Sequence, residues 1–168
     1  KGAGNYTTEF TGVEGHSSQP ALGVNALEYA SRFVARLMEV RQQLPAMAPP
    51  DSPFDPPYST SSVCGMHSGV AHNVIPNKAA VEWEMRVVQD SDRTFLRKAM
   101  RSFIDEVLLP EMKAASPKAD SAETHCVEFA GLMPDPDSEA VRIFQELTGA
   151  NTTDVVAFGT EAGFFQRS

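Results

Sequence analysis

Val81-Glu-Trp-Glu-Met-Arg-Val87 is the stretch of sequence that decides the fold. Large apolar side chains occupy every second position, and charged side chains lie between them. Because successive side chains of a strand point to opposite faces, this alternation predicts a strand buried on one face only. A strand of this kind belongs to a sheet that is covered on one side, and the other elements can be arranged around it.

Three further strands are predicted. Tyr6, Thr8 and Phe10 alternate with polar residues in the same way. Residues 59–66 are rich in hydroxyl and β-branched side chains, which favours a strand at the edge of the sheet, and residues 124–129 supply the last strand. The sheet should therefore be built from segments spread over the first 130 residues.

Two amphipathic helices separate these strands. Residues 25–44 carry apolar side chains at helical spacing, and Pro45 should stop that helix. Asp90 and Ser91 are N-cap candidates for the second helix, which Pro110 should end or kink. The order strand–helix–strand–strand–helix–strand predicts an α+β fold, a ferredoxin-like two-layer sandwich with both helices on one sheet face. Its strands should lie side by side in the order fourth, first, third, second.

The character of the sequence changes after residue 132. Residues 133–137 form a turn-rich boundary, followed by a predicted helix at 138–148 and a predicted buried strand at 155–158. We therefore expect one domain at 1–132 and, at 133–168, the incomplete start of a second, α/β domain. The chain begins at Lys1 rather than at a methionine, so we also expect further sequence upstream.

Charge and cysteine content limit the possible partners and location. The net charge of −8 argues against a nucleic-acid partner, which requires clustered basic residues. No apolar run of membrane length is present, so a membrane is not an expected partner. Cys64 and Cys126 suit the reducing cytoplasm. The predicted strand order puts them on opposite sheet edges, too far apart for a disulfide, and predicts two free thiols.

The sequence also contains few candidates for catalytic chemistry. His-x-Asp, His-Glu-x-x-His and Cys-x-x-Cys spacings are all missing, so the chain by itself encodes no metal centre. His67 and His125 fall in strands and are interpreted as structural, whereas His16 lies on a glycine-flanked loop where catalysis or binding is plausible. Arg86 lies on a polar strand face and is either a surface charge or a clamp for a carboxylate.

Five motifs, in order along the chain, carry a family resemblance. They are His16-Ser-Ser-Gln-Pro-Ala-Leu-Gly-Val-Asn-Ala26, Phe54-Asp-Pro-Pro-Tyr58, Ala71-His-Asn-Val-Ile-Pro76, Glu84-Met-Arg86 and Gly159-Thr-Glu-Ala162. Together they resemble the acetylornithine deacetylases, members of a di-zinc family that also contains succinyl-diaminopimelate desuccinylase and carboxypeptidase G. One departure is Ser68-Gly69, where relatives commonly have two glycines.

The resemblance implies that residues 1–132 are the lid and dimerisation domain of a metal-dependent amide hydrolase. The parent enzyme would be a cytoplasmic homodimer that deacetylates N-acetyl-L-ornithine to L-ornithine and acetate in arginine biosynthesis. Residues 59–64 are the expected pairing edge of the dimer. The family's zinc, or cobalt, ligands lie upstream and downstream of this segment, so the chain alone is expected to be inactive.

The resemblance also implies roles for four residues. His16 would reach into the partner subunit's active site and stabilise the oxyanion formed when zinc-bound hydroxide attacks the amide carbonyl. Asn73 and Arg86 would hold the substrate carboxylate, and Thr160 would line the same pocket. The alternatives are the lid of a related N-acyl-amino-acid hydrolase or desuccinylase, and a free-standing ferredoxin-like module that binds small molecules or proteins.

Overall fold

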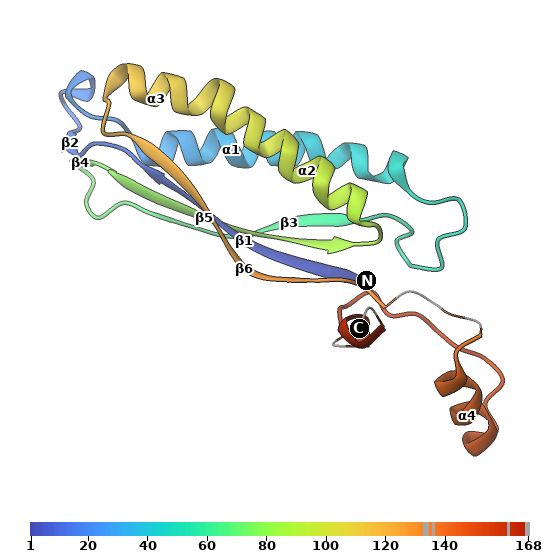
Figure 1. The fold of residues 1–168 in the computed structure, drawn as a ribbon. Coiled ribbons are helices and arrows are strands. Elements are labelled where there is room, and N and C mark those ends of the chain that lie inside the picture. Colours follow the sequence, from blue (N-terminus) through green and yellow to red (C-terminus); the bar gives the residue numbers. More distant parts are fainter. Residues whose placement is uncertain (133–134, 136, 161, 167–168) are drawn as a thin grey trace.

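The structure is a computed structural model. It describes residues 1–168 except 133–134, 136, 161 and 167–168, and the side chains of residues 124–126, 162 and 164 also lie outside the description. An antiparallel sheet with helices on one face forms its main body, and the segment after residue 132 continues from one end of that body (Figure 1). The predicted α+β sandwich is confirmed.

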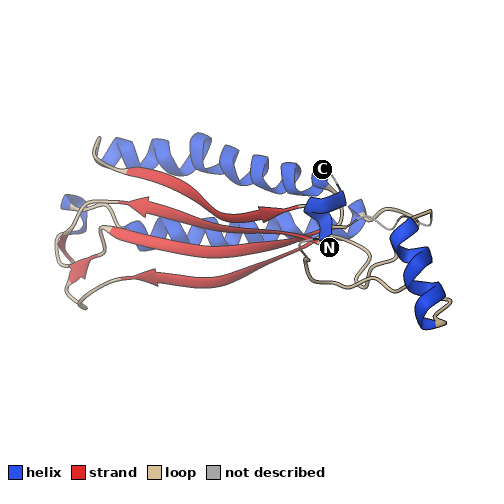
Figure 2. Cartoon of the chain, turned by 60° about the horizontal axis from the view of Figure 1, so that its bottom comes forward, coloured by secondary structure: helices blue, strands red, loops and turns tan. Residues whose placement is uncertain are grey.

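The sheet is formed by β1 (Gly2–Thr11), β3 (Thr60–Ser68), β5 (Lys78–Val87) and β6 (Asp120–Phe129). Their spatial order among the described residues is β3-β5-β1-β6, which confirms the predicted order. Figure 2 looks onto the open face of the sheet, with the helices behind it. The two edge strands are β3 and β6, and they carry Cys64 and Cys126 respectively. Cys64 is a free thiol; the side chain of Cys126 lies outside the described residues, and its thiol stays a prediction.

The core lies between the sheet and the helix layer. Trp83 stacks on Tyr6 with ring centroids 4.3 Å apart, and its indole N–H donates to the buried hydroxyl of Thr8 at 3.1 Å. The hydrogen bond removes the cost of burying a polar group in an apolar core. The alternation in residues 81–87 and 6–10 therefore predicted correctly which face of each strand is buried.

The first helix, α1 (Ala26–Val40), is capped by Asn25, whose Oδ1 accepts from the Leu27 N–H at 3.1 Å. It ends four residues before the predicted Leu44, because the chain tightens into the 3₁₀ segment η2 (Arg41–Met47). Pro45 lies inside η2, so this proline does not itself stop α1.

The second helical segment is continuous across Pro110. It comprises α2 (Asp90–Phe103), a π-helical stretch (Ile104–Leu108) and α3 (Leu109–Ala115), with Pro110 in the first turn of α3. Proline has no backbone N–H to donate to the preceding helical turn. The π-helical stretch shifts the hydrogen-bond pattern just before Pro110, so the helix continues without that donor. The predicted N-caps Asp90 and Ser91 are wrong by one or two residues, since Gln89 occupies the cap and no side chain completes it.

A buried polar network joins four segments beside the start of α2. Ser59 and Asp92 are both fully buried, and the Ser59 hydroxyl donates to Asp92 at 2.5 Å while accepting from the Val88 N–H at 2.8 Å. Gln89 donates its amide to Asp92 at 2.9 Å and to the Met47 carbonyl at 3.0 Å. The network ties together the start of β3, the end of β5, η2 and α2.

Residues beyond 132 agree with the sequence only in part. The predicted helix is present as α4 (Glu139–Thr148), and a short helix, α5 (Ala162–Gln166), follows. The predicted buried strand at 155–158 is wrong, because the segment is irregular and Val155, Val156 and Phe158 are 36%, 41% and 61% exposed. A strand requires a hydrogen-bonding neighbour, and none of the described residues pairs with this segment as a strand. The domain boundary at 132 stays a prediction.

Candidate functional site

His16 and Asn73 are brought together by a small ribbon that the sequence did not predict. β2 (Gly15–His16) pairs antiparallel with β4 (Val74–Ile75), which sets His16 opposite Val74. The Ser17 N–H donates to the Asn73 carbonyl at 3.0 Å. The ribbon is anchored by Ile75, which is only 6% exposed, whereas both His16 and Asn73 are exposed. We call this part of the molecule, residues 15–18 and 69–75, the His16 end.

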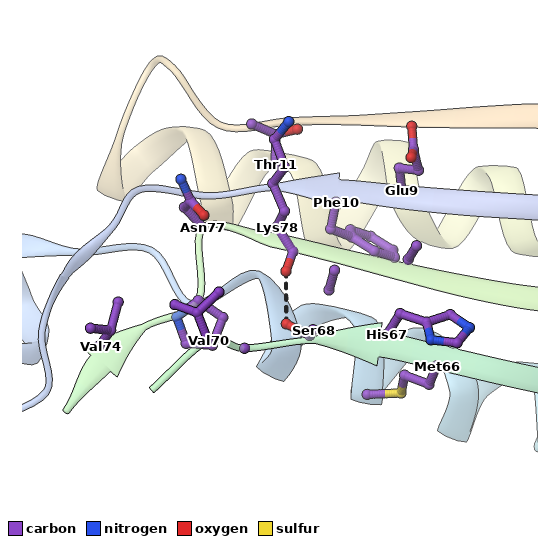
Figure 3. A pocket seen from close by; sticks show the side chains of 14 residues that line it. Glu9, Phe10, Thr11, Met66, His67, Ser68, Val70, Val74, Asn77 and Lys78 are labelled. Atoms are coloured by element: carbon purple, nitrogen blue, oxygen red, sulfur yellow. Dashed lines mark hydrogen bonds between the residues drawn. The ribbon is translucent and has the colours of Figure 1, made fainter. Parts of the chain in front are cut away.

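The loop that leads to β4 turns at Gly69, which has φ +80°. This left-handed conformation favours glycine, so the glycine retained in Ser68-Gly69 occupies the position that the turn needs. The neighbouring Ser68 instead uses its hydroxyl, which donates to the Lys78 carbonyl at 2.7 Å (Figure 3). The departure from two glycines at this turn is therefore compatible with the loop geometry.

A hollow of about 660 Å³ lies beside the His16 end (Figure 3). It is lined by residues from β1, β3 and β5, including the polar side chains of Glu9, His67 and Lys78. None of the four predicted site residues lines it among the described residues. His67, interpreted as structural, is largely exposed, and its Nε2 lies 3.6 Å from a Glu82 carboxylate oxygen.

Arg86 lies at the opposite end of the sheet. It is eight residues beyond Lys78 on β5, a distance of about 26 Å in an extended strand. As predicted, its side chain is on the face opposite Trp83 and Met85. Its Nη2 contacts a Glu84 carboxylate oxygen at 2.7 Å. The guanidinium thus already holds a carboxylate, one from its own strand.

Thr160 lies at the same end as Arg86. It lines a cavity of about 770 Å³ together with Lys1, Phe54 and Val156. The Lys1 side chain donates to the Pro56 and Tyr58 carbonyls at 2.7 and 2.9 Å, and burial is the main cause that lowers the pKa of this ammonium. We call this part, comprising Lys1, residues 54–60, Arg86 and residues 155–160, the Arg86 end. Glu161, the next residue of the Gly159–Ala162 motif, lies outside the described residues.

The four predicted residues therefore form two pairs, at the two ends of one sheet. Figure 1 shows the ribbon of β2 and β4 at one end and the N-terminus at the other. A molecule the size of an acylated amino acid is far shorter than the distance between the ends. Within one copy of this chain, His16 and Arg86 cannot contact the same substrate.

Across the residues described, no group of three or more His, Cys, Asp and Glu side chains is placed to hold a metal ion. The donor set that zinc requires is therefore not assembled by these residues. None of the described helices is long and apolar enough to cross a membrane.

Comparison with known proteins agrees with this architecture. The family model described as the peptidase dimerisation domain matches residues 1–112. This chain belongs to the peptidase dimerisation domain family. The match covers α1, α2 and strands β1 to β5. His16, Asn73 and Arg86 lie within the matched residues, whereas Thr160 lies beyond them.

Relatives and solved structures extend the similarity beyond residue 112. The chain is 32% identical to an acetylornithine deacetylase of Myxococcus xanthus over 161 residues, and 30% identical to one of Klebsiella pneumoniae over 166 residues. These alignments cover 92% and 99% of the chain but only 39% and 42% of the relatives. The chain thus spans about two fifths of the length of these relatives.

Two solved structures illustrate that the fold of this chain is shared more widely. A tripeptidase from Staphylococcus aureus superposes with a TM-score of 0.69 at 18% identity, over 99% of this chain and 40% of that one. An amidase of the hydantoinase/carbamoylase family from Burkholderia vietnamiensis gives 0.68 at 22% identity, over 95% and 35%. At these identities the likeness concerns the fold alone.

Proposed function

We propose that this chain is the dimerisation part of a homodimeric, metal-dependent hydrolase of N-acyl amino acids, with N-acetyl-L-ornithine as the first candidate substrate. The observation that carries the proposal is the separation of His16 and Asn73 from Arg86 and Thr160 by the length of the sheet. Residues that serve one small substrate from opposite ends of a chain must come from two copies. A two-fold dimer supplies that arrangement twice.

Residues at the His16 end act on the reacting group. When an oxygen nucleophile adds to the amide carbonyl, negative charge develops on the carbonyl oxygen, and an imidazole N–H directed at that oxygen stabilises it. His16 is exposed on a ribbon that is held at both strands, so it can extend into another subunit without distorting its own fold. Asn73, on the same ribbon, assists in positioning the substrate.

Residues at the Arg86 end bind the part of the substrate that does not react. The planar guanidinium can hold a carboxylate through two parallel hydrogen bonds, and its contact with Glu84 supports this use. A substrate carboxylate would replace Glu84 in that pair. Thr160 and the cavity it lines would enclose the rest of the molecule.

The metal would have to be bound by residues outside those described. Zinc or cobalt would supply the activated nucleophile in the complete enzyme, but the described side chains do not form a site that fits either ion. The chain alone is accordingly proposed to be inactive.

The proposed dimer forms through β3 and the side of α1 beside it. β3 is an edge strand, and an edge presents hydrogen-bonding groups that a second strand can use. Arg41, which follows α1 as the first residue of η2, marks the side nearest β3, because its guanidinium donates to the Ser61 carbonyl at 3.2 Å. Met38 lies three residues earlier on the same side and is 46% exposed. The antiparallel pairing of two β3 strands would place the Met38 side chains at the interface.

Oligomeric state tests the dimer directly on the 168-residue chain. Sedimentation should give the mass of a dimer, and Met38→Glu should shift it to monomer because the substitution puts a charge into the interface. Leu147→Glu on α4, which replaces an 81% exposed residue, serves as the matched control and should leave the dimer intact. Dissociation by the control and not by Met38→Glu would contradict the proposed interface.

Substrate class is tested with the full-length gene product. Release of acetate from N-acetyl-L-ornithine, assayed beside N-succinyl-diaminopimelate and a panel of N-acyl amino acids, should show a preference for the acetylated ornithine. A desuccinylase or general aminoacylase would show the reverse order. The absence of hydrolysis with every N-acyl substrate and with metal added would overturn the proposal.

A further inference from the structure

The imidazole of His16 is held by the residue two positions further along the chain. Its Nδ1 lies 2.8 Å from the hydroxyl oxygen of Ser18 and accepts a hydrogen bond from the Ser18 backbone N–H at 3.2 Å. The segment is fixed by a turn, in which the Gln19 N–H donates to the His16 carbonyl at 2.9 Å. Ser18 therefore contacts one ring nitrogen with two of its own polar groups.

These contacts determine which ring nitrogen carries the proton. A backbone N–H can only donate, so the Nδ1 that receives it must offer a lone pair. A neutral imidazole has one protonated nitrogen, and with Nδ1 as acceptor the proton is on Nε2. The Ser18 hydroxyl can donate to the same lone pair, which strengthens the preference. Nε2 is the nitrogen farther from the backbone, so the ring presents its N–H outward.

We propose that Ser18 is a positioning residue that fixes the His16 tautomer, so that Nε2–H points toward the substrate oxygen. The proposal rests on the oxyanion-stabilising role proposed above for His16. The opposite tautomer would turn a lone pair toward the developing negative charge and repel it. Neither contact of Ser18 reaches substrate, so its effect is exerted through the imidazole.

A structural role does not account for this arrangement. Both His16 and Ser18 are exposed, and an exposed hydrogen bond adds little to the stability of a fold because water replaces it readily. The backbone of the ribbon is already held by the Ser17 N–H to Asn73 and by the β2–β4 pairing. What the Ser18 contacts add is the orientation and the protonation pattern of one ring.

Nitrogen NMR of the 168-residue chain tests the tautomer without any activity. At about pH 8.5, where histidine side chains are ordinarily neutral, two-bond ¹H–¹⁵N correlation should show His16 with the proton on Nε2. His72, an exposed histidine on the neighbouring loop, is the internal control for an imidazole in that environment. Ser18→Ala removes the hydroxyl but keeps the backbone N–H, so it should reduce the dominance of the Nε2–H form without abolishing it. Ser18→Thr, which keeps the hydroxyl, should restore it, and an unchanged tautomer ratio in Ser18→Ala would show that the hydroxyl does not fix the tautomer. A His16 spectrum with the proton on Nδ1 would overturn the proposal.

Kinetics of the full-length gene product separate this proposal from the function on which it rests. Ser18→Ala should lower kcat by about three- to tenfold with KM little changed, the scale of one lost hydrogen bond, and Ser18→Thr should recover most of it. If His16→Ala lowers kcat and Ser18→Ala does not, Ser18 is not a positioning residue, although His16 keeps its role. If His16→Ala leaves kcat unchanged, the proposed role of His16 itself is wrong.

Discussion

The two-ended arrangement makes a quantitative prediction about mixed dimers. Along β5, Arg86 lies roughly 26 Å from Lys78, which is next to the His16 end. If each active site takes its His16 from one subunit and its Arg86 from the other, then two inactive variants can complement each other. A heterodimer of His16→Ala and Arg86→Ala has one site that carries both substitutions and one site that carries neither.

The expected recovery follows from counting sites. Random reassociation of equal amounts of the two variants makes half of the dimers mixed, and one of the two sites in each mixed dimer is intact, so activity should rise to about one quarter of wild type. The parent variants should each be far below this, since the loss of one oxyanion donor lowers kcat by about 10²–10³. The rise is therefore easily measured against either parent.

The assay mixes the two full-length variants, dissociates and reassociates them, and measures deacetylation at fixed total protein. A matched control mixes His16→Ala with Asn73→Ala. Both residues lie at the His16 end, so every site in that mixed dimer lacks one of them and no recovery is expected. If verified His16/Arg86 heterodimers stay as inactive as their parents, the shared site is refuted.

Three further predictions concern stability and substrate binding. Ser59→Ala should lower the free energy of unfolding by about 2–5 kcal/mol in urea titrations, because it leaves the Asp92 Oδ2 and the Val88 N–H without a buried partner, although Gln89 still donates to the Asp92 Oδ1. Exposed Ser62→Ala should change it by less than about 0.5 kcal/mol, and equal effects would show that the network is not stabilising. Burial, and then the hydrogen bond to Glu128, raise the pKa of Tyr6 well above its ordinary value of about 10, so the unfolded chain loses this proton first and stability should fall as pH rises above about 10. Tyr6→Phe should flatten that fall in alkaline denaturation, although it is less stable at neutral pH, and an unchanged slope would exclude Tyr6 as the cause. Glu84→Gln should lower the KM of a carboxylate substrate by up to about fivefold, since a partly exposed ion pair is worth at most about 1 kcal/mol; a raised KM would mean that Glu84 orients Arg86 and does not compete with substrate.

Sequence patterns predicted the sheet and its covered face. A strand that is buried on one face carries apolar side chains at every second position, as at Val81, Trp83 and Met85. They also predicted that Arg86 lies on the open face. Helix ends were less predictable. The effect of Pro45 and Pro110 depends on 3₁₀ and π-helical turns around them, which are set by packing against the sheet and leave no local signature.

Parts of the candidate site could not be read from the sequence for two physical reasons. The β2–β4 ribbon has two residues in each strand, too few for any periodic pattern, yet it is what brings His16 to Asn73. The local signs in the sequence are Gly15, which is the first residue of β2, and Pro76, which directly follows β4. The predicted strand at 155–158 failed for the opposite reason, since an apolar run indicates burial but does not supply the neighbouring strand that it needs.

The distance between the His16 end and the Arg86 end is set by the length of β5, which extends from one end to the other. Its residues are paired with β1 on one side and β3 on the other along nearly their whole length, so it cannot slide without breaking both ladders. Because side chains alternate with a period of two, the insertion of one residue between Lys78 and Arg86 would move Arg86 to the helix-covered face. It would also lengthen the distance to the His16 end by about 3.3 Å. The register of one strand thus fixes both the direction in which Arg86 faces and how far it lies from the His16 end of its own chain.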